Sequence, residues 1–302
     1  MSMPGSDVQA RPTDAEQETT KSTSGSELMR IGFRVLDGVK IRYAESGGRA
    51  GHSILLTSPW PESVYAFAPL WPLLAQDARL FAVDLPGFGG SDGSEELQSP
   101  RAMGELLVRL IDAFDLGKPH IVGPDIGTSA ALFAAASHPE VLSSVIVGSG
   151  GTAVPIQLGG ALEEWVLAPD IDRFRTLDPR AIVGAALETI QGRTLPAEIR
   201  EDYLASYDGD RFVESMRYVR TYPDELPKLA QLLPEIETPV QIIAGRRDRA
   251  VPLVNAEFLD KRLPNSRLDV LDTGHFVWEE AAGEYASIIA DWVTGGYRDT
   301  AE

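Results

Sequence analysis

The sequence contains no cysteine. Disulfide bonds and thiolate metal sites are therefore excluded, and the composition fits a reducing compartment. The sequence also lacks an apolar run long enough to cross a bilayer, and its first residues lack the apolar core of a signal peptide. These absences predict a cytoplasmic protein without a membrane segment.

Positive charge is scarce. There are 27 Lys and Arg residues against 45 Asp and Glu residues, which gives a formal net charge of -18. An acidic surface repels phosphate backbones and anionic lipid headgroups. The composition therefore predicts no nucleic-acid partner and no binding to membrane surfaces.

The chain is long enough for one large domain with an insertion, because 43% of its 302 residues are hydrophobic. Residues 1–29 are rich in Ser, Thr, Glu and Gly, and we expect them to form a disordered leader. Further along, short apolar segments alternate with helical patterns, which indicates a mostly parallel sheet covered by helices. The expected strands are a hairpin at 32–43 and segments 53–57, 79–83, 120–124, 144–147, 239–245 and 267–271.

The alternation stops between residues 151 and 235, where the sequence is poor in strands and helix-like. It resumes afterwards and ends in an expected helix over 276–293. The sequence therefore predicts an α/β core formed by residues 30–150 and 236–296, with residues 151–235 inserted as a helical cap.

The pentapeptide Gly123-Pro124-Asp125-Ile126-Gly127 lies between an apolar strand and an Ala-rich helix. This is the G-x-S-x-G nucleophile elbow with Asp125 in the serine position. Aspartate has an unperturbed pKa near ~3.9 and is already an anion at neutral pH. Its attack on a saturated carbon gives an ordinary ester, so the pattern predicts displacement through an alkyl-enzyme intermediate. The alternative is a turn aspartate that only satisfies backbone N–H groups.

Two further residues follow strands of the same expected sheet. Asp248 comes after the strand that ends near Gly245, and His275 follows the strand that ends at Leu271. Ligands bind at the carboxyl ends of strands in open α/β sheets. The order of nucleophile, acid and histidine predicts that His275 is the base and that Asp248 supports it. No metal or cofactor is expected.

These motifs resemble the α/β-hydrolase superfamily, and within it the branch with an aspartate nucleophile: epoxide hydrolases and haloalkane and haloacetate dehalogenases. The resemblance covers about Phe33 to Val293. Ser58–Ser63 corresponds to the family's His-Gly-x-Pro loop, with Ser58 and Pro59 in place of His and Gly, and Asp84–Asp92 corresponds to its Asp-x-x-Gly-x-Gly-x-Ser segment. The resemblance implies the α/β-hydrolase fold, a mostly parallel sheet flanked by helices with an inserted helical cap.

The resemblance also implies roles for individual residues. The backbone N–H groups of Trp60 and Ile126 would form the oxyanion hole, although the replacement of the glycine leaves the loop geometry open. Tyr218 would donate a proton to the leaving oxygen from the cap. Further residues expected around the substrate are Pro59, Trp165, Tyr203, Tyr207, Tyr222 and Phe276.

Three functions remain in competition. The favoured one is hydrolysis of small apolar epoxides, because the cap offers tyrosines while Ile126 offers no side-chain donor. The second is a hydrolytic dehalogenase of haloalkanes or haloacids that binds halide with Trp60 and Trp165. The third is a non-catalytic binding protein on the same fold. The expected partners are a small apolar substrate and water, with a homodimer as an option.

Overall fold

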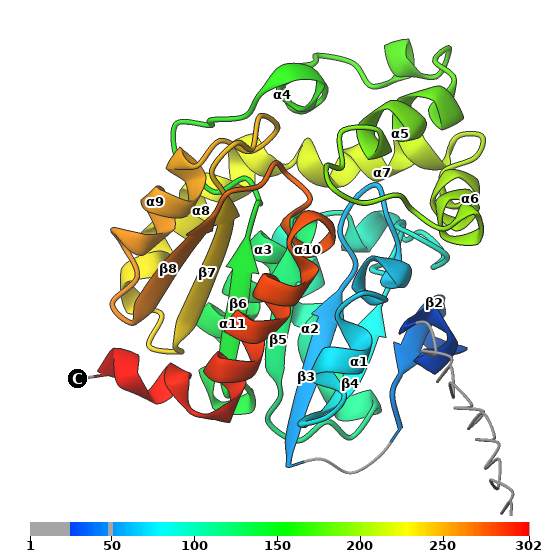
Figure 1. Ribbon diagram of the computed structural model, residues 1–302. Helices are drawn as coiled ribbons and strands as arrows, with labels where there is room; N and C mark the ends of the chain where they lie inside the picture. The colour runs from blue at the N-terminus through cyan, green and yellow to red at the C-terminus, as the bar shows by residue number, and fades with distance from the viewer. Residues whose placement is uncertain (1–24, 48–50, 302) are drawn as a thin grey trace, which may run out of the picture.

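The computed structural model describes residues 25–47 and 51–301, and its centre is an eight-stranded sheet (Figure 1). The strand order is β1-β2-β4-β3-β5-β6-β7-β8, and from β4 to β8 all neighbours are parallel. The mostly parallel sheet predicted from the sequence is confirmed. The strands are β1 (Arg30–Leu36), β2 (Val39–Glu45), β3 (His52–Thr57), β4 (Ala78–Val83), β5 (His120–Pro124), β6 (Ser144–Gly148), β7 (Val240–Gly245) and β8 (Ser266–Leu271).

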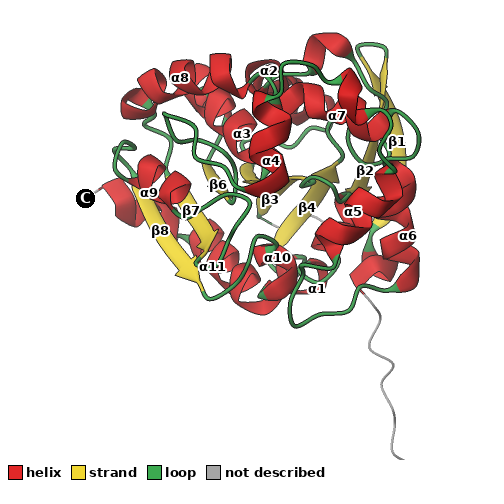
Figure 2. Ribbon diagram, turned by 90° about the horizontal axis from the view of Figure 1, so that it is seen from above, coloured by secondary structure: helices red, strands yellow, loops and turns green. Residues whose placement is uncertain are grey.

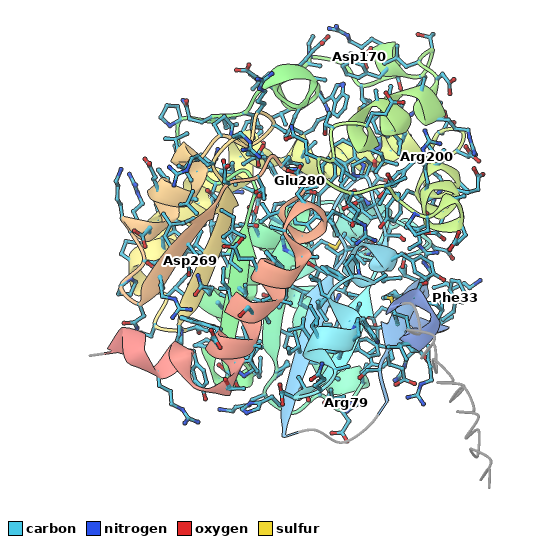
Figure 3. All side chains as sticks on the ribbon, in the orientation of Figure 1. Phe33, Arg79, Asp170, Arg200, Asp269 and Glu280 are labelled. Atoms are coloured by element: carbon cyan, nitrogen blue, oxygen red, sulfur yellow. The ribbon has the colours of Figure 1, made fainter. Side chains whose placement is uncertain are left out.

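The apolar sequences of the central strands match their burial. Every residue of β5, β6 and β7 is buried, as expected for central strands with helices on both faces. The hairpin of β1 and β2 forms the edge of the sheet and turns at Asp37 and Gly38, both with positive φ. Phe33 on this edge strand is 51% exposed, and Figure 3 shows it at the margin of the molecule.

Helices cover both faces of the sheet. Figures 1 and 2 show α1 and α11 on one face and α2, α3 and α8 on the other. The helices are α1 (Trp71–Leu74), α2 (Pro100–Ala113), α3 (Ile126–Ser137), α4 (Gly160–Leu167), α5 (Pro179–Leu187), α6 (Ala197–Ser206), α7 (Arg211–Val219), α8 (Tyr222–Leu232), α9 (Val254–Asp260), α10 (Val277–Glu280) and α11 (Ala282–Thr294).

The segment between β6 and β7 is helical, and its helices α4 to α7 lie over the carboxyl ends of the strands (Figure 1). Arg42 on β2 joins this lid to the core, because its guanidinium contacts both Asp84 and Asp202 of α6. Helix α8 falls within the segment expected to be cap, but it packs against α2 and α3 beside the sheet. The lid over the strand ends is therefore formed by α4 to α7.

Two sequence-based expectations differ from the structure. The closing helix expected over 276–293 is broken at Ala281 into α10 and α11, because Ala281 has φ −128° and leaves the helical region. Residues 1–24 of the expected leader lie outside the described residues. Its last part is ordered, since Gly25–Leu28 form a 3-10 helix and Met29 is buried.

Candidate active site

Asp125 sits on a sharp turn between β5 and α3. Its φ and ψ are 51° and −119°, a strained conformation for a residue with a side chain. The flanking glycines are sterically required: a Cβ on Gly123 would lie 2.7 Å from the Gly127 oxygen, and one on Gly127 would lie 2.0 Å from Thr57 Oγ1. The elbow predicted from the pentapeptide is therefore present, and it raises Asp125 above the sheet edge.

The structure brings Asp125, His275 and Asp248 together. His275 Nδ1 lies 2.8 Å from Asp248 Oδ2, a hydrogen bond, while Nε2 lies 3.8 Å from Asp125 Oδ1. The other oxygen of Asp248 accepts the N–H groups of Ala250 and Val251 at 2.9 and 2.8 Å. These two backbone hydrogen bonds hold the Asp248 carboxylate in place, and its other oxygen orients the ring of His275 toward Asp125.

The backbone N–H of Trp60 donates to Asp125 Oδ2 at 2.7 Å. The loop that carries it begins at Ser58, whose N–H donates to Val83 at 2.9 Å, and contains a cis peptide between Trp60 and Pro61. The N–H of Ile126, the first residue of α3, acts on the same carboxylate and lowers its pKa. The loop therefore presents the Trp60 N–H to Asp125 although Ser58 and Pro59 replace His and Gly.

Burial raises the pKa of Asp125 to about 6, although His275 and the N–H groups of Trp60 and Ile126 oppose this shift. Burial lowers the pKa of His275, but the carboxylates of Asp248 and Asp125 outweigh it and raise the pKa to about 9. Near neutral pH the site therefore contains an ionised Asp125 beside a protonated His275.

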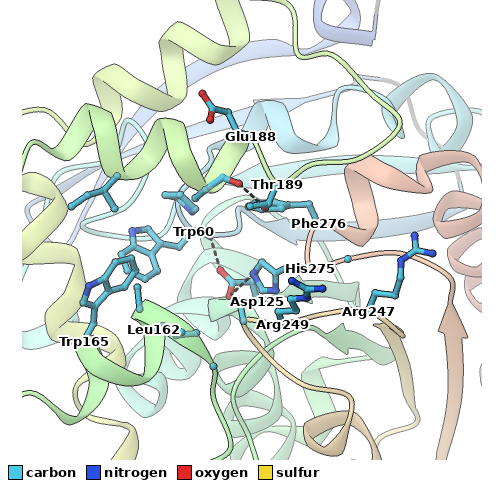
Figure 4. Close-up of a pocket in the computed structure, with 18 of the residues that line it drawn as sticks. Trp60, Asp125, Leu162, Trp165, Glu188, Thr189, Arg247, Arg249, His275 and Phe276 are labelled. Atoms are coloured by element: carbon cyan, nitrogen blue, oxygen red, sulfur yellow. Dashed lines mark hydrogen bonds and ion pairs between the residues drawn. The ribbon is translucent and has the colours of Figure 1, made fainter.

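A cavity of about 600 Å³ opens between the strand ends and the helical lid, and Asp125 and His275 lie on its wall (Figure 4). Trp60, Trp165 and Phe276 line it, as the sequence analysis expected. Ring contacts join Trp60 to Trp165 and to Phe212, each at 5.4 Å between centroids. The cavity therefore has an aromatic wall close to the carboxylate.

Four tyrosines expected at the site do not line the cavity, contrary to the expectation from the sequence. Tyr203, Tyr207, Tyr218 and Tyr222 are all buried, and none lines the cavity. The Tyr218 hydroxyl donates to the Ile126 carbonyl at 2.8 Å, and burial raises the pKa of this phenol well above its usual value. A buried hydroxyl needs a partner, and Tyr218 finds it in the backbone of the elbow rather than in a ligand.

The other three tyrosines are also engaged away from the cavity. Tyr203 donates to Glu279 at 3.3 Å, Tyr207 donates to the Glu62 carbonyl at 3.0 Å, and the ring of Tyr222 packs against that of Tyr218. Tyr203 and Tyr207 thus join the inserted segment to the core. Pro59, also expected at the substrate, is buried in its turn and does not line the cavity.

Glu62 and Glu279, two buried acidic residues near the site, were not predicted from the sequence. Glu62 Oε2 accepts the indole N–H of Trp278 at 2.7 Å, and Glu279 lies 2.9 Å from the guanidinium of Arg193. Burial raises the pKa of Glu62, and the nearby Glu279 raises it further. Burial also raises the pKa of Glu279 to about 7, against the effect of Arg193. The pair joins the loop after Trp60 to α10, which directly follows His275.

Several residues of the cavity wall were also missed. Arg247 and Arg249 flank Asp248, so their position after β7 was a signal that could have found them. The residues from the inserted helices had no such signal, because the faces that those helices turn inward depend on tertiary packing. The missed lining residues are Pro61, Gly159, Gly160, Ala161, Leu162, Ile182, Ala186, Glu188, Thr189, Gln191, Phe212, Arg247, Arg249, Ala250 and Gly274.

Within residues 25–47 and 51–301, no cluster of His, Cys, Asp and Glu side chains has the arrangement of a metal site. The helices of that part of the chain include none long and apolar enough to cross a membrane.

Comparisons with known proteins agree with this fold. The profile of the α/β-hydrolase fold family matches residues 53–282. A 2-hydroxy-6-oxononadienedioate/2-hydroxy-6-oxononatrienedioate hydrolase of Pseudomonas putida is 28% identical, over 89% of this chain and 96% of that protein. The 2-hydroxy-6-oxononadienedioate/2-hydroxy-6-oxononatrienedioate hydrolase 1 of Dechloromonas aromatica is also 28% identical, over 92% of this chain and 98% of that protein.

Among solved structures, the enol-lactonase of Burkholderia xenovorans LB400 is similar with a TM-score of 0.73 and 20% identity, over 87% of this chain and 100% of that one. At this identity the likeness concerns the fold. Together with the family match over most of the chain, these findings establish that the protein belongs to the α/β-hydrolase fold family and is a hydrolase of the α/β type.

Proposed function

We propose that the protein hydrolyses a bond at a saturated carbon through an ester on Asp125. The observation that carries this proposal is an ionised Asp125 on the cavity wall whose Oδ1 lies 3.8 Å from His275 Nε2. That separation is too long for a hydrogen bond, so the oxygen is free to attack. A carboxylate that attacks carbon needs no base, which matches the charge state of the site.

In the first step, an oxygen of Asp125 forms a bond to the substrate carbon, and the leaving group departs with the bonding electrons. The N–H group of Trp60 holds the other carboxylate oxygen, which becomes the ester carbonyl. Esterification removes the negative charge that lies 3.8 Å from His275 Nε2. Because that charge raises the pKa of His275, the pKa falls in the ester, and the ring can lose its proton.

In the second step, neutral His275 takes a proton from water while the water oxygen attacks the ester carbonyl. The developing oxyanion is stabilised by the N–H groups of Trp60 and Ile126. Collapse of the tetrahedral intermediate breaks the bond between the former carbonyl carbon and the alkyl oxygen. The imidazolium of His275 returns its proton to that oxygen, and the alcohol leaves with one oxygen from Asp125. Asp248 stabilises the imidazolium through its 2.8 Å hydrogen bond to Nδ1.

The leaving group is constrained by the donors in the cavity. An alkoxide leaving from an epoxide needs a proton, and the four tyrosines expected to supply it do not line the cavity. A halide leaves as a stable anion and needs only N–H donors. Trp60 and Trp165 line the cavity, and the buried Trp60 Nε1 has no hydrogen-bond partner among the described residues, so its N–H would serve a halide that reaches it. These observations favour a carbon–halogen bond over an epoxide. The hydrolase relatives support hydrolysis without selecting between the two.

A single turnover in heavy-oxygen water tests the proposal, with bromohexane and epoxyhexane as probes. We expect the first product molecule to carry ordinary oxygen and Asp125 to carry the label, because water attacks the ester carbonyl and not the substrate. Mass spectrometry of the product and of the Asp125 peptide measures both. Label in the first product would indicate direct attack by water, with Asp125 as a base. Binding of the probes without any turnover would favour a binding protein.

The first step should depend on pH through Asp125. Its pKa is raised to about 6, so the reactive anion is lost as the pH falls below that value. We expect the alkylation rate to fall about ten-fold per pH unit in that range. Hydrolysis of the ester needs neutral His275. Because the ester no longer carries the charge that helps to raise the pKa of His275 to about 9, hydrolysis should keep its rate down to a pH below that value. Rapid-quench measurements of the two steps across pH check this. An alkylation rate that stays constant well below pH 6 would contradict it.

A further inference from the structure

Arg249 lines the active-site cavity, yet its guanidinium has no hydrogen bond or ion pair with any residue in the part of the chain that the structure describes. Arg249 is exposed, so this guanidinium is hydrated and available to a ligand that enters the cavity. Figure 4 shows the guanidinium beside the ring of His275, at the end of the cavity away from Trp165. The cavity therefore has an aromatic end and an end with a free cation.

The neighbouring charged side chains of the cavity do not form an ion pair with Arg249. Arg247 lines the same cavity but binds Asp272 at 2.7 Å, and Figure 4 shows it extending away from Asp125. Glu188 also lines the cavity, but it lies on the far side of the view from Arg249, beyond Thr189 and Phe276. No acidic residue of the described chain reaches the Arg249 guanidinium.

The net charge of the triad determines how Arg249 would affect the binding of a charged substrate. Asp125 and Asp248 are anionic and His275 is cationic near neutral pH, which leaves one net negative charge at the site. An anionic substrate would be repelled by that charge. Arg249 offsets it at one end, and its planar fork matches the two oxygens of a carboxylate.

We infer that the substrate carries a carboxylate, which Arg249 binds while the apolar body of the substrate lies along the aromatic wall of Trp60, Trp165 and Phe212. This inference rests on the proposed function, because it places the reacting carbon of that substrate between Arg249 and the aromatic wall, next to Asp125. It replaces the small apolar substrate favoured from the sequence by an amphiphilic one with a single negative group, as in the haloacids kept there as an alternative.

Ligand binding without turnover gives the first test. The fluorescence of the tryptophans, two of which line the cavity, can be titrated with hexanoate and with hexanamide, which match in size and differ in charge. We expect hexanoate to bind about ten-fold more tightly to the native protein, the ratio typical of one charge-assisted hydrogen bond. In Arg249→Gln the two ligands should bind equally, and Arg249→Lys should keep part of the preference.

Arg246→Gln is the matched control. Arg246 belongs to the same loop, is exposed and does not line the cavity, so this change removes the same charge without touching the site. It should keep the preference for hexanoate. Equal binding of the two ligands to the native protein, or an unchanged preference in Arg249→Gln, would overturn the inference.

Turnover separates this inference from the proposed function. A series of ω-bromoalkanoates of increasing chain length is compared with the corresponding amides. We expect Arg249→Gln to lower kcat/KM for the acids about ten-fold relative to the corresponding amides. If the amides are hydrolysed and the acids show no dependence on Arg249, only the carboxylate assignment fails. If acids, amides and epoxides all remain intact while hexanoate still binds through Arg249, the proposed reaction fails and the anion site stands.

Discussion

His275→Gln is expected to reduce multiple-turnover hydrolysis by about 10²–10⁴-fold, the usual contribution of a general base. The formation of the ester should remain largely intact, because Asp125 is an anion before substrate arrives and needs no base to attack. The enzyme should therefore accumulate an alkyl ester on Asp125. Intact-protein mass spectrometry after exposure to the probe measures it.

The mass increase would also identify the leaving group. An epoxide adds as a whole molecule, whereas an alkyl halide adds without its halogen. The matched control is His138→Gln, since His138 is half-buried at the end of α3, beside Glu105, and does not line the cavity. It should turn over at the native rate and accumulate nothing. The double variant Asp125→Ala/His275→Gln should form no adduct. Loss of the first step in His275→Gln would show that the histidine activates the attacking group.

Asp248→Asn is expected to slow hydrolysis of the ester by up to about 10⁴-fold, the effect of this change in a serine-protease triad. The structure gives the reason. One oxygen of Asp248 accepts the N–H groups of Ala250 and Val251, so the asparagine oxygen must occupy that position. Its NH2 group then faces His275 Nδ1, which can only accept. The ring is held with its proton on Nε2 and cannot take another from water.

Ester formation should change by less than about ten-fold in Asp248→Asn, because His275 is not required for the attack. Pre-steady-state kinetics with separate observation of adduct and product distinguishes the two steps. Asp272→Asn serves as the control, since Asp272 follows the same strand, is exposed and pairs with Arg247 instead of His275. A variant in which alkylation slowed while hydrolysis kept its rate would refute the assigned role of Asp248.

The sequence by itself determined the fold class, the elbow and the three residues of the triad. These depend on local physics. Apolar runs of strand length define central strands, and glycines on either side of Asp125 permit a turn that other residues would block. Parallel strands then place the residues that follow them at one edge, which brought Asp125, Asp248 and His275 together without further information.

Only the tertiary structure decided which side chains of the lid reach the ligand. Phe212 and Tyr218 both lie on α7, but six positions separate them, which puts them on different faces of a helix with 3.6 residues per turn. Phe212 faces the cavity, whereas Tyr218 packs against the elbow and donates to Ile126. Similarly, Glu62 and Glu279 lie near each other only because the loop after Trp60 packs against α10, and the free cation at Arg249 depends on which acids lie near it. Such pairings are set by the packing of the whole chain, and no spacing along the sequence records them.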